Sequence, residues 1–233
     1  MRSARPQRSY HHGDLRQTLI DAAVRHIEQQ GTEGLSLRAL AREAGVSATA
    51  PYRHFESRTA LLAAIATQGF EELCLALAQD EDRLRAEPLL VLFESGLAYV
   101  DYARRNAVKY HLMFGDAIGD FSPYEELTDA AEASYQRFEG ILRVGIETGA
   151  LESVEIREFG GTVWSLVHGL AGVVMAGDRK RVQVPAAHLD TLAPLQAQQR
   201  VLAAPERALA RLMGGIVRDT EAFEVVRRRA GLV

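Results

Sequence analysis

The sequence predicts an all-α protein: a small N-terminal helical unit joined by a long helix to a larger helical domain. Apolar residues recur at helical spacing nearly throughout the 233 residues, and no alternating apolar and polar run is long enough to propose a sheet. Charge divides the chain as well. Residues 1–58 carry nine Arg, no Lys and six acids, net +3, whereas residues 59–233 carry 18 basic and 25 acidic residues, net −7.

The first helix is expected from Asp14, which can cap it, to about Gln30, because apolar residues recur at every fourth position and Gly31 follows. Ser36 is expected to cap a second helix with a similar apolar stripe. Gly45 ends that helix, since glycine accepts the left-handed conformation that a tight reversal needs.

Two further helices complete the N-terminal pattern. Ser47 is expected to cap a very short helix that runs to about Phe55. Pro51 lacks the N–H for the first intrahelical bond, so this helix is expected to start in a tight, 3₁₀-like turn. Ser57 is expected to cap a long helix that continues to Gln79 and joins the basic part of the chain to the acidic part.

The acidic part predicts six more helices, at residues 88–105, 107–114, 124–148, 156–176, 205–217 and 220–229. Residues 178–204 contain two prolines and are expected to form a long loop, partly helical at most. Residues 159–177 carry no formal charge over nearly the length of a membrane span. Their five glycines and His168 favour a helix buried by protein, so no membrane partner is expected.

A short helix, a tight glycine turn and a second short helix form the arrangement of a helix-turn-helix, whose second helix enters the major groove of DNA. Three residues at the start of the second helix are small enough for close approach to base edges: Ala48, Thr49 and Ala50. Four nearby residues carry long donors suited to phosphates or guanine: Tyr52, Arg53, His54 and Arg58.

At these residues the chain resembles the TetR (tetracycline-repressor-like) family of transcriptional regulators. The likeness runs from about residue 10 to residue 70, and its most specific part is the cluster LRALAREAGVS at 37–47 followed by YRHFES at 52–57. The resemblance implies a homodimer that reads palindromic double-stranded operator DNA and binds a small-molecule effector in its C-terminal domain. It implies a DNA-binding domain at 10–70 and an effector-binding and dimerisation domain at 71–233. Residues 1–9 are polar and basic and are expected to form a flexible arm, which either assists DNA binding or is an idle solvated tail.

Carried over residue by residue, the resemblance assigns base-edge contacts to Arg38 and to Ala48, Thr49 and Ala50. Ser47 is a further candidate for DNA contact. The resemblance assigns phosphate contacts to Tyr52, His54 and Arg58, and either kind of contact to Arg53. Alternatives stay open for four of these residues. Ala48 and Ala50 either touch thymine methyl groups or only leave space for the DNA. Tyr52 and His54 either contact DNA or have a structural role alone. The chain departs from the family at Pro51, where leucine is common, and at Arg58, where lysine is usual.

Aromatic residues and histidines of the C-terminal part are candidates to line an effector pocket: Phe93, Tyr102, His111, Phe114, Tyr135, Phe138, Trp164 and His168. Trp164 and His168 lie four residues apart, so they share one helix face, and with Gly169 they resemble a Trp-x-x-x-His-Gly signature in one subgroup of the family. The alternative for this pair is packing in the core or in a dimer interface, where Gly169 and Gly172 allow close helix approach.

Several other functions are disfavoured by what the sequence contains. The single cysteine, Cys74, allows no internal disulfide and fits a reducing, cytoplasmic setting. The chain has no P-loop, glycine-rich dinucleotide turn, HExxH motif or nucleophile elbow, so neither an enzyme nor a cofactor is expected. No metal site is expected either. A helical interaction module without DNA binding is a further alternative, which the Tyr52–Phe55 cluster argues against.

Overall fold

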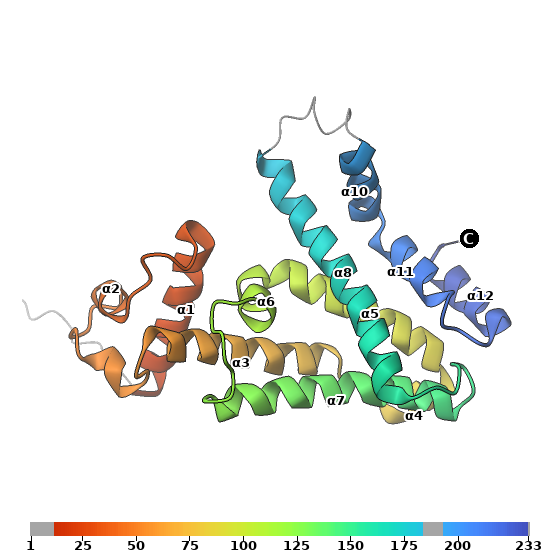
Figure 1. Cartoon of the computed structure of the whole chain (residues 1–233), viewed down its shortest axis with the longest axis horizontal. Coiled ribbons are helices and arrows are strands. Elements are labelled where there is room, and N and C mark those ends of the chain that lie inside the picture. The colour runs from red at the N-terminus through yellow and green to blue at the C-terminus, as the bar shows by residue number, and fades with distance from the viewer. Residues whose placement is uncertain (1–11, 184–192, 233) are drawn as a thin grey trace, which may run out of the picture. The chain divides into compact units, whose positions relative to one another are not determined.

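A computed structural model describes residues 12–183 and 193–232, and these residues form helices without a strand (Figure 1). The predicted all-α fold is confirmed. The expected basic arm at 1–9 lies outside the described residues, as does the 184–192 part of the expected loop. The chain divides into two compact units. The first unit comprises residues 1–69 and 108–129, and the second comprises residues 70–107 and 130–233.

The first unit contains α1 (His12–Gln30), α2 (Leu37–Glu43), the 3₁₀ helix η1 (Ala50–Arg53), α3 (Arg58–Ala76) as far as Gly69, and α6 (Ala107–Phe114) from Val108. Its core is aliphatic, and Leu19, Leu40 and Leu61 are almost completely buried. These side chains come from the apolar stripes that predict the helices. The first unit is therefore held together by packing of α1 and α2 with η1 and α3.

The predicted C-terminal end of α1 and both predicted ends of α2 are confirmed. The predicted start of α1 is wrong: the helix begins at His12, so Asp14 lies inside it and is not its cap. The hydroxyl of Ser36 accepts from the backbone N–H of Ala39 at 3.2 Å, which is an N-cap. Gly31 and Gly45 follow the two helices with φ of +75° and +69°, in the left-handed region where a side chain would be strained. The cap of the long helix is confirmed too, because the hydroxyl of Ser57 accepts from the N–H of Ala60 at 3.0 Å.

The third helix differs from the prediction in type and in its cap. Only Ala50–Arg53 form a helix, and it is 3₁₀ rather than α. Ser47 does not cap it through its side chain: its hydroxyl lies 3.3 Å from the hydroxyl of Thr49. Pro51 explains the type, since it has no N–H to donate within the turn, and the surrounding bonds are short-range, such as His54 N–H to Pro51 carbonyl at 2.9 Å.

The second unit contains the rest of α3, α4 (Glu81–Ala86), α5 (Pro88–Arg105), α7 (Glu125–Glu147) from residue 130, α8 (Ile156–Gln183), α10 (Ala193–Ala203), α11 (Pro205–Met213) and α12 (Thr220–Arg229). The predicted helices at 88–105, 107–114 and 220–229 match in their bounds, and the helix at 124–148 is shorter by one residue at each end.

Four differences concern helix ends in this unit. The helix from Ser57 ends at Ala76, and Asp80 caps a separate helix, α4, by accepting from the N–H of Arg83 at 2.9 Å. Helix α8 continues seven residues beyond the predicted end at 176. Much of the segment expected to be a loop is helix α10. Helix α11 ends at Met213 rather than at residue 217.

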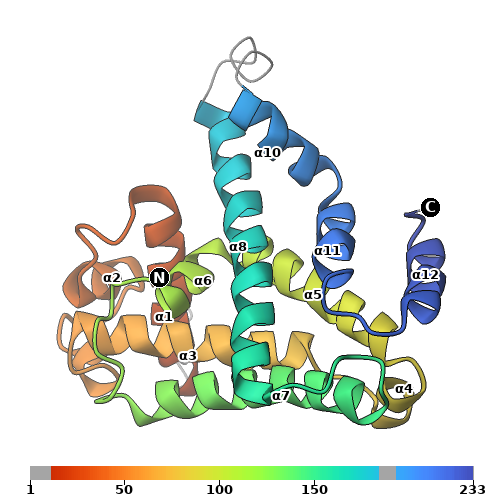
Figure 2. The same cartoon turned by 45° about the vertical axis from the view of Figure 1, so that its right-hand side comes forward.

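Helices α5 and α8 form the centre of the second unit, and α10 and α11 return along α8 (Figure 2). Helix α11 also packs closely on α5: a Cβ added at Gly96 would lie 2.8 Å from a methyl carbon of Leu209. This tight approach depends on the absence of a side chain at Gly96.

An isolated β-bridge between Leu151 and Val217 joins the turn after α7 to the turn after α11.

Two described helices are long and apolar enough to cross a membrane by length and composition alone. In α3, 56% of the most apolar window is buried inside the protein, which is the behaviour of a core helix. In residues 156–176 of α8, only 33% of the corresponding window is buried. The expected burial of this helix by protein is therefore not met within one chain, and a large part of the apolar surface of α8 is left uncovered.

Candidate nucleic-acid interface and ligand site

Helix α2, the turn at Gly45 and η1 form one helix-turn-helix whose buried and exposed faces separate cleanly. The buried side consists of Leu37, Leu40 and Ala41 from α2 with Pro51 and Phe55 from the segment of η1. These apolar residues pack against α1 and hold the short 3₁₀ turn in place. A turn of four residues has little stability of its own, so its position is set by this packing.

The residues predicted to contact DNA lie on the other side. Arg38, Ser47, Ala48, Thr49, Tyr52 and Arg53 are exposed, and Ala50, His54 and Arg58 are half-buried. Tyr52 is 47% exposed although the preceding Pro51 is buried. The exposed residues therefore combine small side chains with guanidinium, phenol and imidazole donors, a combination suited to a groove and its flanking phosphates.

Arg58 has an additional role that sequence reasoning missed. Its guanidinium donates to the backbone carbonyl of Thr32 at 2.7 Å. Thr32 lies in the turn between α1 and α2, so this bond fixes the start of α3 to that turn. A guanidinium has five N–H donors, so this contact leaves others for a phosphate.

Further cations support the same unit. The guanidinium of Arg16 lies 5.6 Å from the centre of the Phe55 ring, in cation–π geometry. Arg25 on α1 pairs with Glu43 on α2 at 3.4 Å. Arg42 is exposed and follows Arg38 by one helical turn, so both belong to one face of α2. That spacing was visible in the sequence and makes Arg42 an additional candidate for DNA contact.

Comparison with known proteins agrees with this geometry in both parts of the chain. Residues 19–65 match the family model described as bacterial regulatory proteins, tetR family. Residues 92–198 match the model of the tetracyclin repressor-like C-terminal domain. The chain belongs to the TetR family. The family is one of helix-turn-helix, DNA-binding transcriptional regulators and is generally non-enzymatic.

Individual TetR-family relatives are distant. The HTH-type transcriptional regulator Rv1816 of Mycobacterium tuberculosis is 26% identical over 137 residues, 56% of this chain and 57% of that protein. The chain thus matches little more than half the length of this relative. The nicotine-responsive transcriptional repressor HdnoR of Paenarthrobacter nicotinovorans is 38% identical over 69 residues, 30% of this chain and 36% of that one. A solved protein of unknown function from Rhodococcus sp. RHA1 is 29% identical with a TM-score of 0.65, covering 87% of this chain and 97% of that chain.

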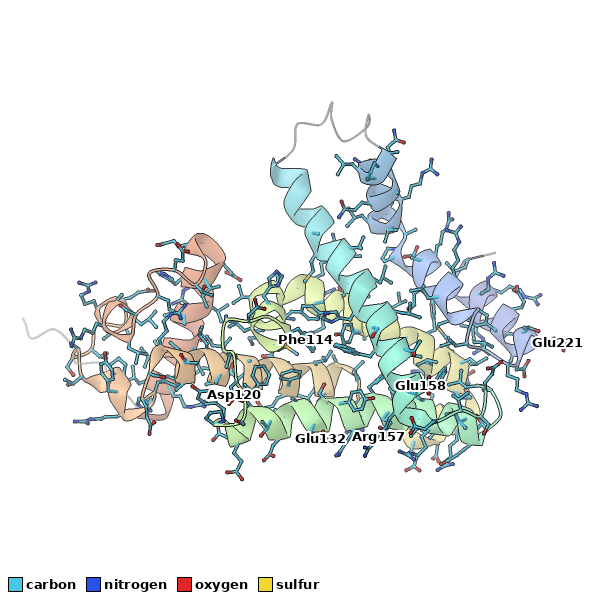
Figure 3. The ribbon with its side chains drawn as sticks, in the orientation of Figure 1. Phe114, Asp120, Glu132, Arg157, Glu158 and Glu221 are labelled. Atoms are coloured by element: carbon cyan, nitrogen blue, oxygen red, sulfur yellow. The ribbon has the colours of Figure 1, made fainter. Side chains whose placement is uncertain are left out.

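The candidate effector residues of this TetR-family protein are divided between the units. His111 and Phe114 lie on α6 in the first unit, and Phe114, marked in Figure 3, makes an edge contact with Tyr110 at 4.8 Å between ring centres. The other six lie in the second unit. Of these, Phe93 is a core residue, 3% exposed, and the rings of Tyr135 and Phe138 lie 6.1 Å apart on α7.

Trp164 and His168 come together with Tyr99 on α5, which is not among the eight candidate pocket residues. The rings of Trp164 and His168 are 4.8 Å apart, and the Tyr99 hydroxyl lies 3.1 Å from Nδ1 of His168. Burial lowers the pKa of His168, so the neutral imidazole is favoured near neutral pH. The cluster therefore offers aromatic surface beside one uncharged hydrogen-bonding group.

Tyr102 is buried one turn further along α5 and donates to the Glu72 carboxylate on α3 at 3.4 Å. Burial and the neighbouring carboxylate raise the pKa of Tyr102, so its phenol keeps its proton. Tyr135 packs against α8, since its hydroxyl is 2.9 Å from where a Cβ of Gly160 would be. Both tyrosines therefore join helices of the second unit to one another.

Proposed function

We propose that this TetR-family protein is a ligand-responsive repressor that binds a palindromic operator as a homodimer in the cytoplasm. The observation that carries the DNA-reading part is the exposed face of α2 and η1, with Arg38 and residues 47–50 at its centre. Tyr52, Arg53, His54 and Arg58 surround that centre and reach the phosphates. The buried residues of the same helices pack in the core of the first unit and thereby fix the position of this face.

Selection of bound sites from random DNA tests this part of the proposal. A palindromic consensus with half-sites about one DNA turn apart is expected. The Arg38→Ala variant should lose preference at one or two positions, by about 1–3 kcal/mol per base pair. The Tyr52→Phe variant should weaken all sequences alike and leave the salt dependence of binding unchanged, because the phenol that it alters carries no charge.

Arg143→Ala is the matched control, because Arg143 is exposed on α7 in the second unit, where it pairs with Glu139. Its affinity and preference should equal those of the wild type. If Arg38→Ala weakened binding equally on every DNA sequence, the proposed role of Arg38 in reading bases would be wrong. A protein that selects no sequence at all would overturn the proposed operator.

The proposed homodimer is supported by the open face of α8. Gly161, Gly169 and Gly172 have no atom of the chain within 4 Å of where a Cβ would lie, so packing within one chain does not require them. Leu166 and Val173 lie on the same face and are 39% and 41% exposed. A second copy of α8, with α11, would cover this apolar face and approach closely at the glycines.

Analytical ultracentrifugation tests the dimer. The wild-type chain should sediment as a dimer, and Leu166→Glu should shift it to monomer because a carboxylate would be buried in the interface. Glu158→Gln, at the exposed start of α8, is a control that should leave the dimer intact (Figure 3). A wild-type monomer at micromolar concentration would overturn this part of the proposal.

Ligand response is supported by the aromatic cluster of Trp164, His168 and Tyr99, together with continuity of α3 between the units. Residues of α3 belong to the first unit as far as Gly69 and to the second from Phe70, so a shift of this helix can reach η1. The name of HdnoR assigns a nicotine response to that relative. For this chain we propose a small, largely apolar effector of unspecified identity.

A thermal-shift screen of small apolar compounds, followed by release from the selected operator, tests the response. A tenfold loss of operator affinity requires about 1.4 kcal/mol of differential binding. Trp164→Ala should weaken the response to any hit and leave operator binding without ligand unchanged. Hits that raise the melting temperature yet leave operator affinity unaltered would contradict the proposed coupling.

A further inference from the structure

Helices α11 and α12 are joined by a short turn and are neighbours in both views (Figures 1 and 2). Side chains of both helices line a cavity of about 590 Å³ that is open to solvent. Three arginines line this cavity: Arg207, Arg211 and Arg227. None of the residues assigned to DNA reading or to the aromatic cluster takes part in it. A cavity of this size is in the range that holds small organic ligands.

The arginines are arranged for a shared ligand. Arg207 and Arg211 lie one turn apart on α11, so they project from one face, and Arg227 enters from α12. Arg227 is paired with Glu224, which also lines the cavity. Neither Arg207 nor Arg211 has an ion-pair partner among the residues that the structure describes. The four side chains together leave a charge of about +2 facing the cavity.

The net charge of the C-terminal part changes along the sequence, and its surplus of arginine is confined to residues 193–232. Residues 193–232 carry seven Arg and four acids, net +3. Residues 59–192 carry 11 basic and 21 acidic residues, net −10. An anion is repelled by most of the C-terminal part and attracted at this end, which makes the cavity selective for negative ligands.

The remaining wall is mostly apolar, with Thr220 as its polar member. Phe223 of α12, which is 6% exposed, and Leu232 supply its larger apolar side chains. The phosphates of DNA could contact the arginines, but the duplex would not fill the space beside Phe223. A small molecule with an apolar body and one acidic group satisfies both walls at once, since guanidinium groups bind carboxylate, sulfonate and phosphate oxygens in paired geometry.

We propose that the cavity between α11 and α12 is a binding site for a small amphipathic organic anion, separate from the aromatic cluster of Trp164 and His168. Its acidic group is bound by Arg207 and Arg211. Its apolar body lies against Phe223.

Isothermal titration calorimetry of the full chain with 2-naphthalenesulfonate at low salt tests the proposal. One molecule per chain should bind. The double variant Arg207→Gln, Arg211→Gln should bind about tenfold more weakly or worse, a loss of about 1.4 kcal/mol. Arg200→Gln is the matched control, because Arg200 is exposed on α10 outside the cavity, and its affinity should equal that of the wild type.

Two further probes separate charge from apolar contact. The neutral 2-naphthalenesulfonamide should bind much more weakly than the sulfonate, because it lacks the charge. Inorganic phosphate should also bind more weakly, because it lacks the apolar body. Equal affinity of the double variant and the wild type would overturn the site, as would equal affinity for sulfonate and sulfonamide. Phosphate binding as tight as the sulfonate would overturn the contact with Phe223. Circular dichroism melts establish that each variant is folded.

Discussion

Gly45 gives the sharpest test of how the reading element is positioned. It ends α2 with φ of +69°, and no atom outside its chain neighbours lies within 4 Å of where a Cβ would be. A Gly45→Ala change therefore adds a methyl group that clashes with nothing beyond its own backbone. Any loss of stability must come from forcing an L-residue into the left-handed region.

The expected magnitude follows from two opposing terms. Left-handed backbone costs an alanine roughly 1–2 kcal/mol, whereas its stiffer unfolded chain returns about 0.4–1 kcal/mol. Gly45→Ala should therefore lower the free energy of unfolding of the first unit by about 1 kcal/mol. Gly140→Ala is the matched control: it adds the same methyl group in open space inside α7 and should raise stability by about 0.5–1 kcal/mol.

Native-state hydrogen exchange is the suitable assay, because it reports on each unit separately. The Val46 amide, which donates to Ala41 at 2.9 Å across this turn, should exchange about fivefold faster in Gly45→Ala. Gly45→Asn should lose less, since asparagine tolerates the left-handed region. Unchanged or slower exchange in Gly45→Ala would refute the reasoning.

Three more predictions concern neighbouring contacts. Arg58→Gln removes the charged donor to the Thr32 carbonyl and should destabilise the first unit by about 1–2 kcal/mol in urea unfolding; loss of DNA affinity at wild-type stability would instead make Arg58 a pure phosphate contact. Ser36→Ala removes the N-cap of α2 and should cost about 1 kcal/mol, with Ser36→Thr close to wild type in the same measurement. Burial lowers the pKa of His168, so the unfolded chain binds a proton more readily, and stability should fall as pH drops through about 6.5. Melting temperatures at about pH 7.5 and 5.5 should differ less in His168→Gln than in the wild type, and equal differences would contradict this.

Local signals predicted most of the fold because helix formation is decided by neighbours in sequence. Apolar stripes and the caps at Ser36 and Ser57 placed the helices of the first unit to within a few residues. Two of the errors involve glycine and proline. The helix predicted to end at residue 176 continues through Gly177, because glycine inside a helix costs only about 1 kcal/mol relative to alanine. Two prolines predict a loop at 178–204, yet Pro194 lies in the first turn of α10, where proline is accepted.

The sites were only partly predictable, for a different reason. Side chains on one short element, such as Arg38 and Arg42, can be assigned to a face from their spacing alone. Contacts between distant segments cannot be assigned in this way. Tyr99 and His168 are 69 residues apart, and the sequence around either residue gives no indication of the other. The charge of Arg58 predicts a contact with DNA phosphate. Its hydrogen bond to the Thr32 carbonyl, in contrast, depends on how the start of α3 folds back against the turn after α1.

The separation of faces in α2 and η1 has an evolutionary consequence. The residues that hold the element in place, Leu40, Pro51 and Phe55, are buried, and Ala48 and Thr49 are exposed and bear no share of the core. Substitutions at these exposed positions can alter which DNA is recognised with little effect on folding, since surface changes rarely exceed about 0.5 kcal/mol. A duplicated gene could thus acquire a new target through a few changes while its scaffold stayed intact.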